Sequence, residues 1–352
     1  MDLLAVSAPD FAARRAAVAR HGELAVPAGG LGRLGELGVW LAAVQGSCPP
    51  RPPARPRVVV IAGDHGIAEA GVSVHPAGST ARQVAAVREH TAPVTVVAPV
   101  AGASVRVVDV ALDTDTDTDT DTDAGEGPHR IRRGSGRIDR EDALSAEEAA
   151  AALQLGRDLA DQEVDGGADL LVPAALGVGA STPAAVLVAA LTRTEPVAVV
   201  GRGSGIDDAG WMRKTAAVRD ALRRARPHVA DPVALLRVAG GADLAALAGF
   251  CAQAAIRRTP VLLDGLVVGA AALLADKLAP GAKDWWLVAQ RSPEPAMDVV
   301  IARLALEPLQ ELGLRVGDGA GALTALPLLQ MAARLLAETA TATTAVPDPA
   351  GA

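Results

Sequence analysis

Residues 57–66 read RVVVIAGDHG, and this stretch decides the fold class. After Arg57 comes an uninterrupted apolar run rich in β-branched side chains, and Gly63-Asp64-His65-Gly66 follows it directly. Such a run, ended by a glycine-containing loop, is typical of a strand buried on both faces of a parallel sheet. The segment therefore predicts a parallel sheet inside a globular core.

Similar apolar runs occur further along the chain. Residues 105–110 (VRVVDV) predict a second strand, residues 169–172 a third, and from there strand, glycine-rich loop and helix alternate to about residue 337. Helices that join parallel strands make right-handed crossovers and cover the sheet. We therefore expect an α/β fold: a large domain with a mainly parallel sheet that helices cover on both faces.

Helical patterns lie on both sides of this unit. Residues 10–20 are Ala-rich, residues 32–43 place apolar side chains at helical spacing, and the proline-dense SCPPRPPARPR that follows marks a boundary near residue 55. We expect the first helices and the last one to pack together as a small helical subdomain. The predicted division is residues 1–54 and 321–338 in the small helical subdomain, residues 55–320 in the α/β domain, and a disordered tail at 339–352.

Local patterns place further elements. Residues 79–90 predict a helix, whereas prolines leave residues 94–100 ambiguous. Ser145 and Glu148 form a capping box, in which each side chain accepts the other residue's backbone N–H. A helix should therefore run from this box to about residue 162.

An alternating Asp-Thr repeat fills residues 113–123. Its charges repel one another and it has no apolar face, so we expect a solvated, disordered loop over residues 113–127. Calcium binding is the alternative, but the repeat lacks the glycine and the closing glutamate of an EF-hand loop.

The composition argues against several classes of function. There are 33 Lys+Arg against 41 Asp+Glu, a net charge of −8, whereas a nucleic-acid-binding protein needs a basic surface. Tyrosine is absent and only two Phe and four Trp are present, which leaves no aromatic platform for single strands. We therefore expect no nucleic-acid partner.

Cysteine usage and the N-terminus indicate the compartment. Cys48 and Cys251 are too few for a disulfide framework and show no metal-ligand spacing. The N-terminus lacks the charge pattern of a signal peptide, and no uninterrupted apolar run reaches the roughly 18 residues of a membrane span. We expect a cytoplasmic protein without a metal site and without a membrane partner.

Three predicted strand-to-helix junctions are rich in glycine: residues 177–182 (GVGAST), 201–205 (GRGSG) and 317–321 (GDGAG). In the first, Thr182 and Pro183 fit the N-cap and first position of a helix. Glycine lets backbone N–H groups crowd an anion, and a helix N-terminus adds a partial positive charge. A phosphate is the natural ligand, with Arg202 and Lys214 as countercharges. The alternative is that each loop is only a tight turn, since no Walker A or Rossmann fingerprint is present.

Several acids and histidines are candidates for proton transfer. Asp318 lies between glycines at a helix start, where it could act as a general base or only offset the helix dipole. Asp64 and Asp264 end predicted strands, and the carboxyl ends of parallel strands open onto the ligand crevice. His65 and His75 are further acid/base candidates, without a visible partner.

The motifs, in chain order, resemble those of a known family. They are GDHGIAEAGVSVHP (63–76), GVGASTPA (177–184), GRGSGIDDAGWMRK (201–214), AGGADLAALAG (239–249), PVLLDG (260–265) and LGLRVGDGAGA (312–322). Together they are similar to nicotinate-nucleotide:dimethylbenzimidazole phosphoribosyltransferase, which builds the lower-ligand nucleotide of cobalamin. The resemblance covers about residues 20–337 and leaves out the Asp-Thr repeat and the tail.

This resemblance implies a reaction and a set of site residues. Nicotinate mononucleotide binds by its phosphate, a base removes the N–H proton of a benzimidazole, and the benzimidazole nitrogen displaces neutral nicotinate from the ribose, without cofactor or metal. The expected catalytic residue is Asp318. The expected phosphate- and nucleotide-binding residues are Gly177, Gly179, Ser181, Thr182, Gly201, Arg202, Gly203, Lys214, Asp264, Gly265, Arg291 and Ser292, and the expected base-binding residues are Ser73, His75, Gln83, Gly317 and Gly319. The family also implies a homodimer.

Four positions depart from the family pattern. Asp318 stands where the family has glutamate, Ala174-Ala175-Leu176 replaces Gly-Glu-Met, Ala180 replaces asparagine, and Gln290 replaces histidine. The shorter Asp318 side chain moves the carboxylate back by roughly 1.5 Å. Such changes fit a different aromatic acceptor, for example a purine or a phenol, or a catalytically silent homologue that binds the mononucleotide.

Overall fold

The computed structural model describes residues 5–76, 78–114 and 129–342. Its described strands form one six-stranded sheet in the order β2-β1-β3-β4-β5-β6, and every neighbouring pair is parallel. The predicted α/β fold is thus confirmed. The strands are β1 (Pro56–Gly63), β2 (Ser104–Ala111), β3 (Leu170–Leu176), β4 (Val261–Leu263), β5 (Trp286–Gln290) and β6 (Pro308–Gln310).

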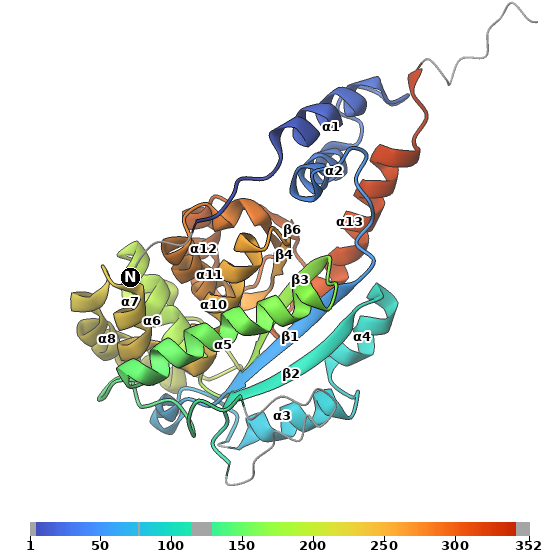
Figure 1. The fold of residues 1–352 in the computed structure, drawn as a ribbon. Coiled ribbons are helices and arrows are strands. Elements are labelled where there is room, and N and C mark those ends of the chain that lie inside the picture. Colours follow the sequence, from blue (N-terminus) through green and yellow to red (C-terminus); the bar gives the residue numbers. More distant parts are fainter. Residues whose placement is uncertain (1–4, 77, 115–128, 343–352) are drawn as a thin grey trace, which may run out of the picture.

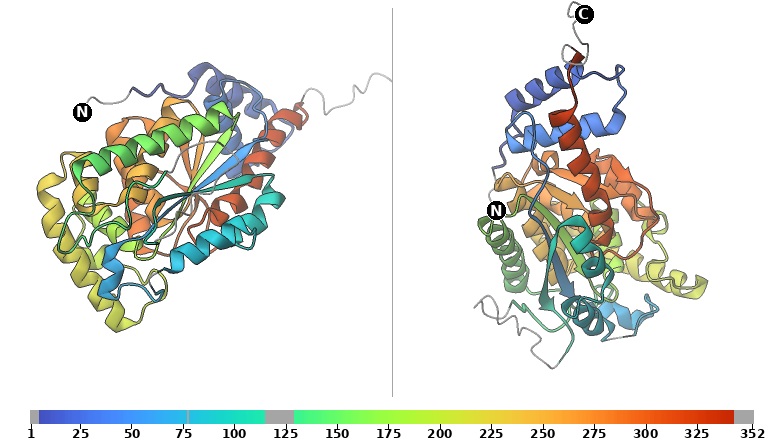
Figure 2. Two further views of the ribbon diagram at one scale, coloured as in Figure 1. Left: turned by 60° about the horizontal axis from the view of Figure 1, so that its bottom comes forward. Right: turned by 90° about the vertical axis from the view of Figure 1, so that its right-hand side faces the viewer.

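Helices cover both faces of this sheet (Figures 1 and 2). Val59 and Ile61 of β1 point to one core cluster, while the alternate residues Val58 and Val60 point to the other, so β1 is buried on both sides as its sequence predicts. The first cluster is closed by α5 (Ala146–Asp165), α6 (Ser181–Thr192), α8 (Asp208–Ala225), α9 (Pro232–Ala239), α10 (Ala242–Ile256), α11 (Gly265–Leu278) and α12 (Pro295–Leu304), and the second by α3 (Ser79–Arg88), α4 (Pro93–Ala101) and α13 (Ala320–Glu338).

The strand order creates a crevice. From β1 the chain crosses to β2 on one side and then returns across β1 to β3 on the other. Loops that leave the carboxyl ends of two such strands turn in opposite directions, and ligands of open α/β sheets bind in the space between them. The fold therefore places the ligand site at the carboxyl ends of β1 and β3.

The N-terminal helices α1 (Phe11–Glu23) and α2 (Gly32–Gln45) pack with the C-terminal half of α13, beside the α/β layers (Figures 1 and 2). The Arg20 guanidinium donates to the carbonyl oxygens of Leu336 and Ala337, at 2.5 and 2.6 Å. The first half of α13 packs on the sheet. The division of the chain near residue 55 stays a prediction.

Helix α13 is long and apolar enough to cross a membrane, but 56% of its most apolar window is buried inside the fold. Its apolar side chains face β1, β3 and β4 in the second core cluster. A helix at the core of a globular domain passes the same test of length and composition.

Several sequence expectations need correction. The alternation of strand and helix breaks between β3 and β4, where the short helix α7 (Pro196–Val199) and the 3₁₀ helix Arg226–His228 join four longer helices. The second glycine loop accordingly follows α7 and not a strand. Thr182 is not an N-cap either, because Ala180 already has helical dihedrals and α6 begins at Ser181.

Other boundaries agree or extend the prediction. The ambiguous stretch 94–100 lies within helix α4, since Pro93 occupies the first turn, where a proline costs no hydrogen bond. The capping box is present, with Glu148 N donating to Ser145 Oγ at 3.1 Å and Ser145 N to Glu148 Oε2 at 2.7 Å. Most of the Asp-Thr repeat, from residue 115 on, and the tail from residue 343 on lie outside the described residues. Two further 3₁₀ helices are Gly66–Ala70 and Ala282–Trp285.

Helices α5 and α10 meet backbone to backbone, which makes two glycines a test of the packing. A Cβ at Gly249 would collide with the carbonyl oxygen of Leu153, and one at Gly156 with that of Ala246. Gly249→Ala should lower the free energy of unfolding by about 2 kcal/mol, as overpacking a core does. Urea denaturation measures this change.

The matched control is Gly22→Ala in α1, where an added Cβ meets no atom within 4 Å. Alanine in that helix should leave the free energy of unfolding unchanged or raise it by up to about 1 kcal/mol. Equal stability of Gly249→Ala and the wild type would contradict the described packing.

Candidate active site

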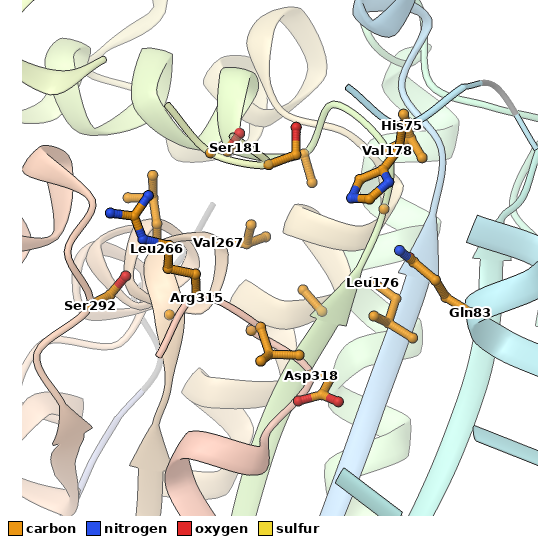
Figure 3. A pocket seen from close by; sticks show the side chains of 18 of the residues that line it. His75, Gln83, Leu176, Val178, Ser181, Leu266, Val267, Ser292, Arg315 and Asp318 are labelled. Atoms are coloured by element: carbon orange, nitrogen blue, oxygen red, sulfur yellow. The ribbon is translucent and has the colours of Figure 1, made fainter. Parts of the chain in front are cut away.

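A cavity of about 370 Å³ opens at the carboxyl ends of the strands. The segments that follow β1, β3, β4, β5 and β6 each contribute to its wall, as the crevice position requires (Figure 3). Most of the expected site residues line it: Ser73, His75, Gln83, Gly177, Gly179, Ser181, Gly203, Asp264, Gly265, Ser292, Gly317 and Asp318.

The loop after β3 forms one end of the cavity. Gly177 presses against the end of β1, because a Cβ there would overlap the Gly63 carbonyl oxygen. Gly179 has a φ of +87°, which favours glycine, and the chain then enters α6 at Ser181. This end of the cavity thus combines a close backbone, a serine hydroxyl and a helix N-terminus, which suits an anion.

Lys214 supports this loop from behind. The side chain, on α8, is fully buried, and its Nζ donates to Ser181 Oγ at 2.9 Å and to the Gly201 carbonyl at 3.3 Å. Burial lowers the pKa of Lys214 below its usual value, and the nearby Glu294 carboxylate opposes this only in part. Lys214 therefore joins the first and second glycine loops and adds positive charge beneath them, although it does not line the cavity.

Glu294 is a site residue that the sequence reasoning missed. It lines the cavity, is 8% exposed, and its Oε1 accepts the N–H of Gly203 at 2.9 Å. Its Oε2 is buried without a partner among the described residues. The available signal was its position shortly after a strand, β5, because Asp264 was identified as an acid at the end of a predicted strand.

At the far side of the cavity lies Asp318, 1% exposed. Its Oδ1 accepts the N–H of Ala320 and its Oδ2 that of Val94, both at 3.0 Å. Burial raises the pKa of the carboxyl, although these two bonds oppose the rise. In Figure 3 the carboxyl group lies across the cavity from Ser181, with its oxygens turned away from that residue.

Asp264 places a second carboxyl at the start of α13. It accepts the Gln290 side-chain N–H at 3.2 Å and the Ala322 N–H at 3.2 Å. Burial raises its pKa, and Asp318 raises it further. A Cβ on Gly321 would lie 2.6 Å from both Asp264 oxygens, so glycine is what lets the helix approach. Gln290, at a departure from the family pattern, thus holds Asp264.

The loop after β1 forms the other wall. Ser73 Oγ lies 3.2 Å from Ser204 Oγ, which also accepts the Val74 N–H at 3.0 Å, and the His75 N–H donates to Ser73 Oγ at 3.1 Å. Gln83 projects from α3 on the same side (Figure 3). Between this wall and Ser292 the lining is apolar and suits flat rings: Val72, Leu176, Val178, Leu266, Val267, Leu314 and Val316.

Some expected residues lie elsewhere. Arg202 donates to Ile206 O at 2.9 Å and pairs with Asp208, while Arg291 pairs with Asp298 at 2.8 Å on the surface. Those expected residues that do not line the cavity are Thr182, Gly201, Arg202, Lys214, Arg291 and Gly319.

A different arginine faces the cavity. Arg315 lines it and is exposed, and no hydrogen bond or ion pair ties its guanidinium within the described parts of the chain (Figure 3). The sequence reasoning missed it because one arginine in a loop gives no signal.

His65 and Asp64 do not line the cavity. His65 Nε2 lies 3.0 Å from Asp243 Oδ2, and both side chains are buried. Burial by itself lowers the pKa of His65, but Asp243 and Asp64 more than reverse this, so the net pKa is raised. Within residues 5–76, 78–114 and 129–342, no group of three or more His, Cys, Asp or Glu is placed to hold a metal ion.

Comparisons with known proteins give the class. A family model described as "Phosphoribosyltransferase" matches residues 6–346. The chain belongs to this family of phosphoribosyltransferases, and it is therefore a transferase.

The relatives of this chain carry a more specific name than the family. The Mycobacterium ulcerans protein named nicotinate-nucleotide–dimethylbenzimidazole phosphoribosyltransferase is 55% identical over 336 residues, covering 96% of this chain and 92% of its own. The protein of that name from Mycobacterium avium is 56% identical over 350 residues, covering 99% of each. A crystal structure under that title from Thermus thermophilus has a TM-score of 0.88 and 36% identity, covering 96% of this chain and 98% of its own.

The charges around Lys214 predict a measurable titration. The chain has three lysines, Lys214, Lys277 and Lys283, so their NMR signals can be assigned. Glu294→Gln removes the carboxylate that opposes the effect of burial, so the pKa of Lys214 should fall below its wild-type value and its charge should be lost at lower pH. An NMR titration of the side-chain signals measures this, with Lys277 and Lys283 unchanged as internal controls. An unchanged Lys214 pKa would show that Glu294 does not act on it.

Proposed function

We propose that this chain transfers the ribosyl phosphate of nicotinate mononucleotide to dimethylbenzimidazole, giving α-ribazole phosphate and nicotinate in cobalamin biosynthesis. The observation that carries the proposal is a single cavity with a glycine-rich loop and a helix N-terminus at one end, apolar lining residues and a buried carboxyl at the other end. Membership in the family and the names of the relatives support the same substrates.

The cavity gives each part of the mononucleotide a place. The phosphate binds at Gly177, Gly179 and Ser181, where the α6 N-terminus and the buried Lys214 favour negative charge. Gly203 lies at the same end of the cavity, with its N–H donated to Glu294. Arg315 supplies a guanidinium at the open side. Asp264, Gly265 and Ser292 lie along the ribosyl-nicotinate side, and the acceptor ring lies among Ser73, His75, Gln83 and the apolar lining.

Asp318 is the proposed base. It takes the N–H proton of the benzimidazole, whose other ring nitrogen forms the bond to C1′ of the ribose. The bond from C1′ to nicotinate breaks at the same carbon, and nicotinate leaves as a neutral ring that needs no acid. A pKa raised by burial makes the carboxylate a better base near neutral pH. Each oxygen that accepts one backbone N–H keeps a second lone pair for the substrate proton.

Positioning supplies the rest of the rate. The cavity holds the two rings with the attacking nitrogen near C1′, which replaces an encounter in solution by a step within one complex. The family resemblance also supports a homodimer, and the two free cysteines fit a cytoplasmic location; we propose both with the function.

The first prediction from this mechanism concerns Asp318. Asp318→Asn should lower kcat by at least about 100-fold, because general base catalysis contributes that much or more. Asp318→Glu should keep or raise kcat, since it restores the family's residue. Nicotinate release under saturating substrates measures both, and wild-type turnover by Asp318→Asn would disprove the base assignment.

The pH profile follows from the same carboxyl. The base works when it is ionised, and burial raises its pKa, so activity should fall on acidification at a higher pH than an ordinary aspartate, with a pKa of about 3.9, would give. The acid limb of kcat against pH measures this. A limb at the ordinary aspartate value would contradict the raised pKa.

Lys214→Ala tests the phosphate end. The variant loses the Lys214 hydrogen bonds to Ser181 and Gly201, so KM for nicotinate mononucleotide should rise about tenfold. The value of kcat should change little, because the lysine contacts the loop and not the reacting atoms. Lys277→Ala is the control, as that exposed lysine donates to Val229 O on the surface, at 3.0 Å. An unchanged KM would remove Lys214 from the phosphate site.

A panel of acceptors tests the substrate itself. Nicotinate release from the mononucleotide should be fastest with dimethylbenzimidazole. Faster release with a purine or a phenol would mean that the smaller Ala175 and Ala180 side chains have changed the acceptor. Binding of the mononucleotide without release with any base would mean a catalytically silent homologue.

A further inference from the structure

Thr80 connects the two halves of the cavity without lining it. The residue is the second of α3, and its side chain is fully buried. Its hydroxyl donates to Asp64 Oδ1 and accepts the backbone N–H of Val178 at 3.0 Å. A hydroxyl has one proton, and Asp64 takes it, so the oxygen lone pairs are left for Val178.

Asp64 is itself held firmly. It follows β1, its Oδ2 accepts the Asp113 N–H at 3.0 Å, and its own N–H donates to Ala111 O at 2.8 Å, at the end of β2. Its carboxylate therefore occupies a position set by two adjacent strands. Hydrogen bonds to a charged acceptor are about twice as strong as neutral ones, so the Thr80 hydroxyl has a fixed direction.

The contacts from Asp64 through Thr80 end at the 177–181 loop, the proposed phosphate-binding loop. Val178 lies between Gly177 and Gly179 and lines the cavity. Gly177 already touches the end of β1, so Thr80 is the second support of the loop on this side. Helix α3 also carries Gln83, one turn further on, in the acceptor wall. The Thr80 hydroxyl thus links the 177–181 loop to helix α3, which carries Gln83.

We infer that Thr80, fixed by Asp64, is a positioning residue that holds the 177–181 loop in register with α3, and so sets both the affinity for the mononucleotide and its placement against the acceptor. The inference rests on the proposed function for the identity of the ligand. Neither side chain touches substrate, and both act through the Val178 backbone.

The experiment compares Thr80→Val with Thr80→Ser. Valine has the shape of threonine without the hydroxyl, and serine keeps the hydroxyl without the methyl group. Thr80→Val should raise KM for nicotinate mononucleotide about tenfold, equivalent to about 1.4 kcal/mol, with a smaller change in kcat. Thr80→Ser should stay within about twofold of the wild type.

Thr259→Val is the matched control. Thr259 is also buried and its hydroxyl donates to Arg257 O at 3.3 Å, but it lies before the amino end of β4 and does not line the cavity. Its KM should equal that of the wild type. Equal KM values for Thr80→Val and Thr80→Ser would overturn the inference. If Thr80→Val does not fold, Thr80→Ala against Thr80→Ser isolates the hydroxyl in the same way.

Two further readouts separate this inference from the proposed function. Calorimetric titration with the mononucleotide alone should give a Kd about tenfold weaker for Thr80→Val than for Thr80→Ser. This result together with no nicotinate release by the wild type would refute the transferase reaction and leave the inference standing. Amide exchange of Val178 should be faster in Thr80→Val than in Thr80→Ser, and equal rates would refute the positioning role whatever the ligand.

Discussion

Two buried carboxyl groups at the first turn of α13 are the interaction on which the site depends. Asp264 and Asp318 receive the N–H groups of Ala322 and Ala320, which have no partner within the helix. Asp318 also receives the N–H of Val94, and so joins α13 to α4. The positive end of α13 lets two acids lie in the core, where burial would otherwise disfavour their charge. One helix start therefore holds a wall of the cavity and the carboxyl group that we propose as the base.

The opposite end of the cavity uses the reverse arrangement. There a buried cation, Lys214, lies behind a glycine loop, and the Glu294 carboxylate lies close enough to favour its charged form. Glu294 meanwhile occupies the Gly203 N–H, a group that a phosphate oxygen would seek. The cavity thus has two buried carboxyl groups at one end and a glycine-rich loop backed by a buried lysine at the other. The proposed binding mode, with the phosphate of the mononucleotide at the lysine end, follows this arrangement.

The sequence predicts the sheet well because the signal is local. The run 57–62 needs nothing beyond its own β-branched residues to indicate a strand buried on both faces, and glycine loops after strands indicate the carboxyl edge. Helix starts are less certain: α6 begins one residue before Thr182, because a turn closed by Ala180 N and Gly177 O already winds the chain.

The site was only partly predictable. Asp264, at the end of β4, and Asp318, before the start of α13, line the cavity as expected, whereas Asp64, after β1, does not. Arg202 and Arg291 lie outside it because each pairs with an aspartate in its own segment, at Asp208 and Asp298, a competition that no spacing rule reveals. Arg315 reaches the cavity only through tertiary packing, which its residue type cannot indicate, whereas Glu294 gave the signal of an acid shortly after a strand.

The position of α13 in the chain has a consequence for biosynthesis. Val58 and Val60 are made early, but the helix that covers their face of the sheet spans Ala320–Glu338. Helices α3 and α4 emerge early, but as the ribosome delivers the chain from its N-terminus, the part of that apolar surface that α13 covers stays uncovered until almost the whole polypeptide has emerged. The N-terminal helices α1 and α2 also pack on α13, so they cannot complete their packing before it is made. A nascent chain that stalls before α13 therefore has neither a closed core nor a complete cavity.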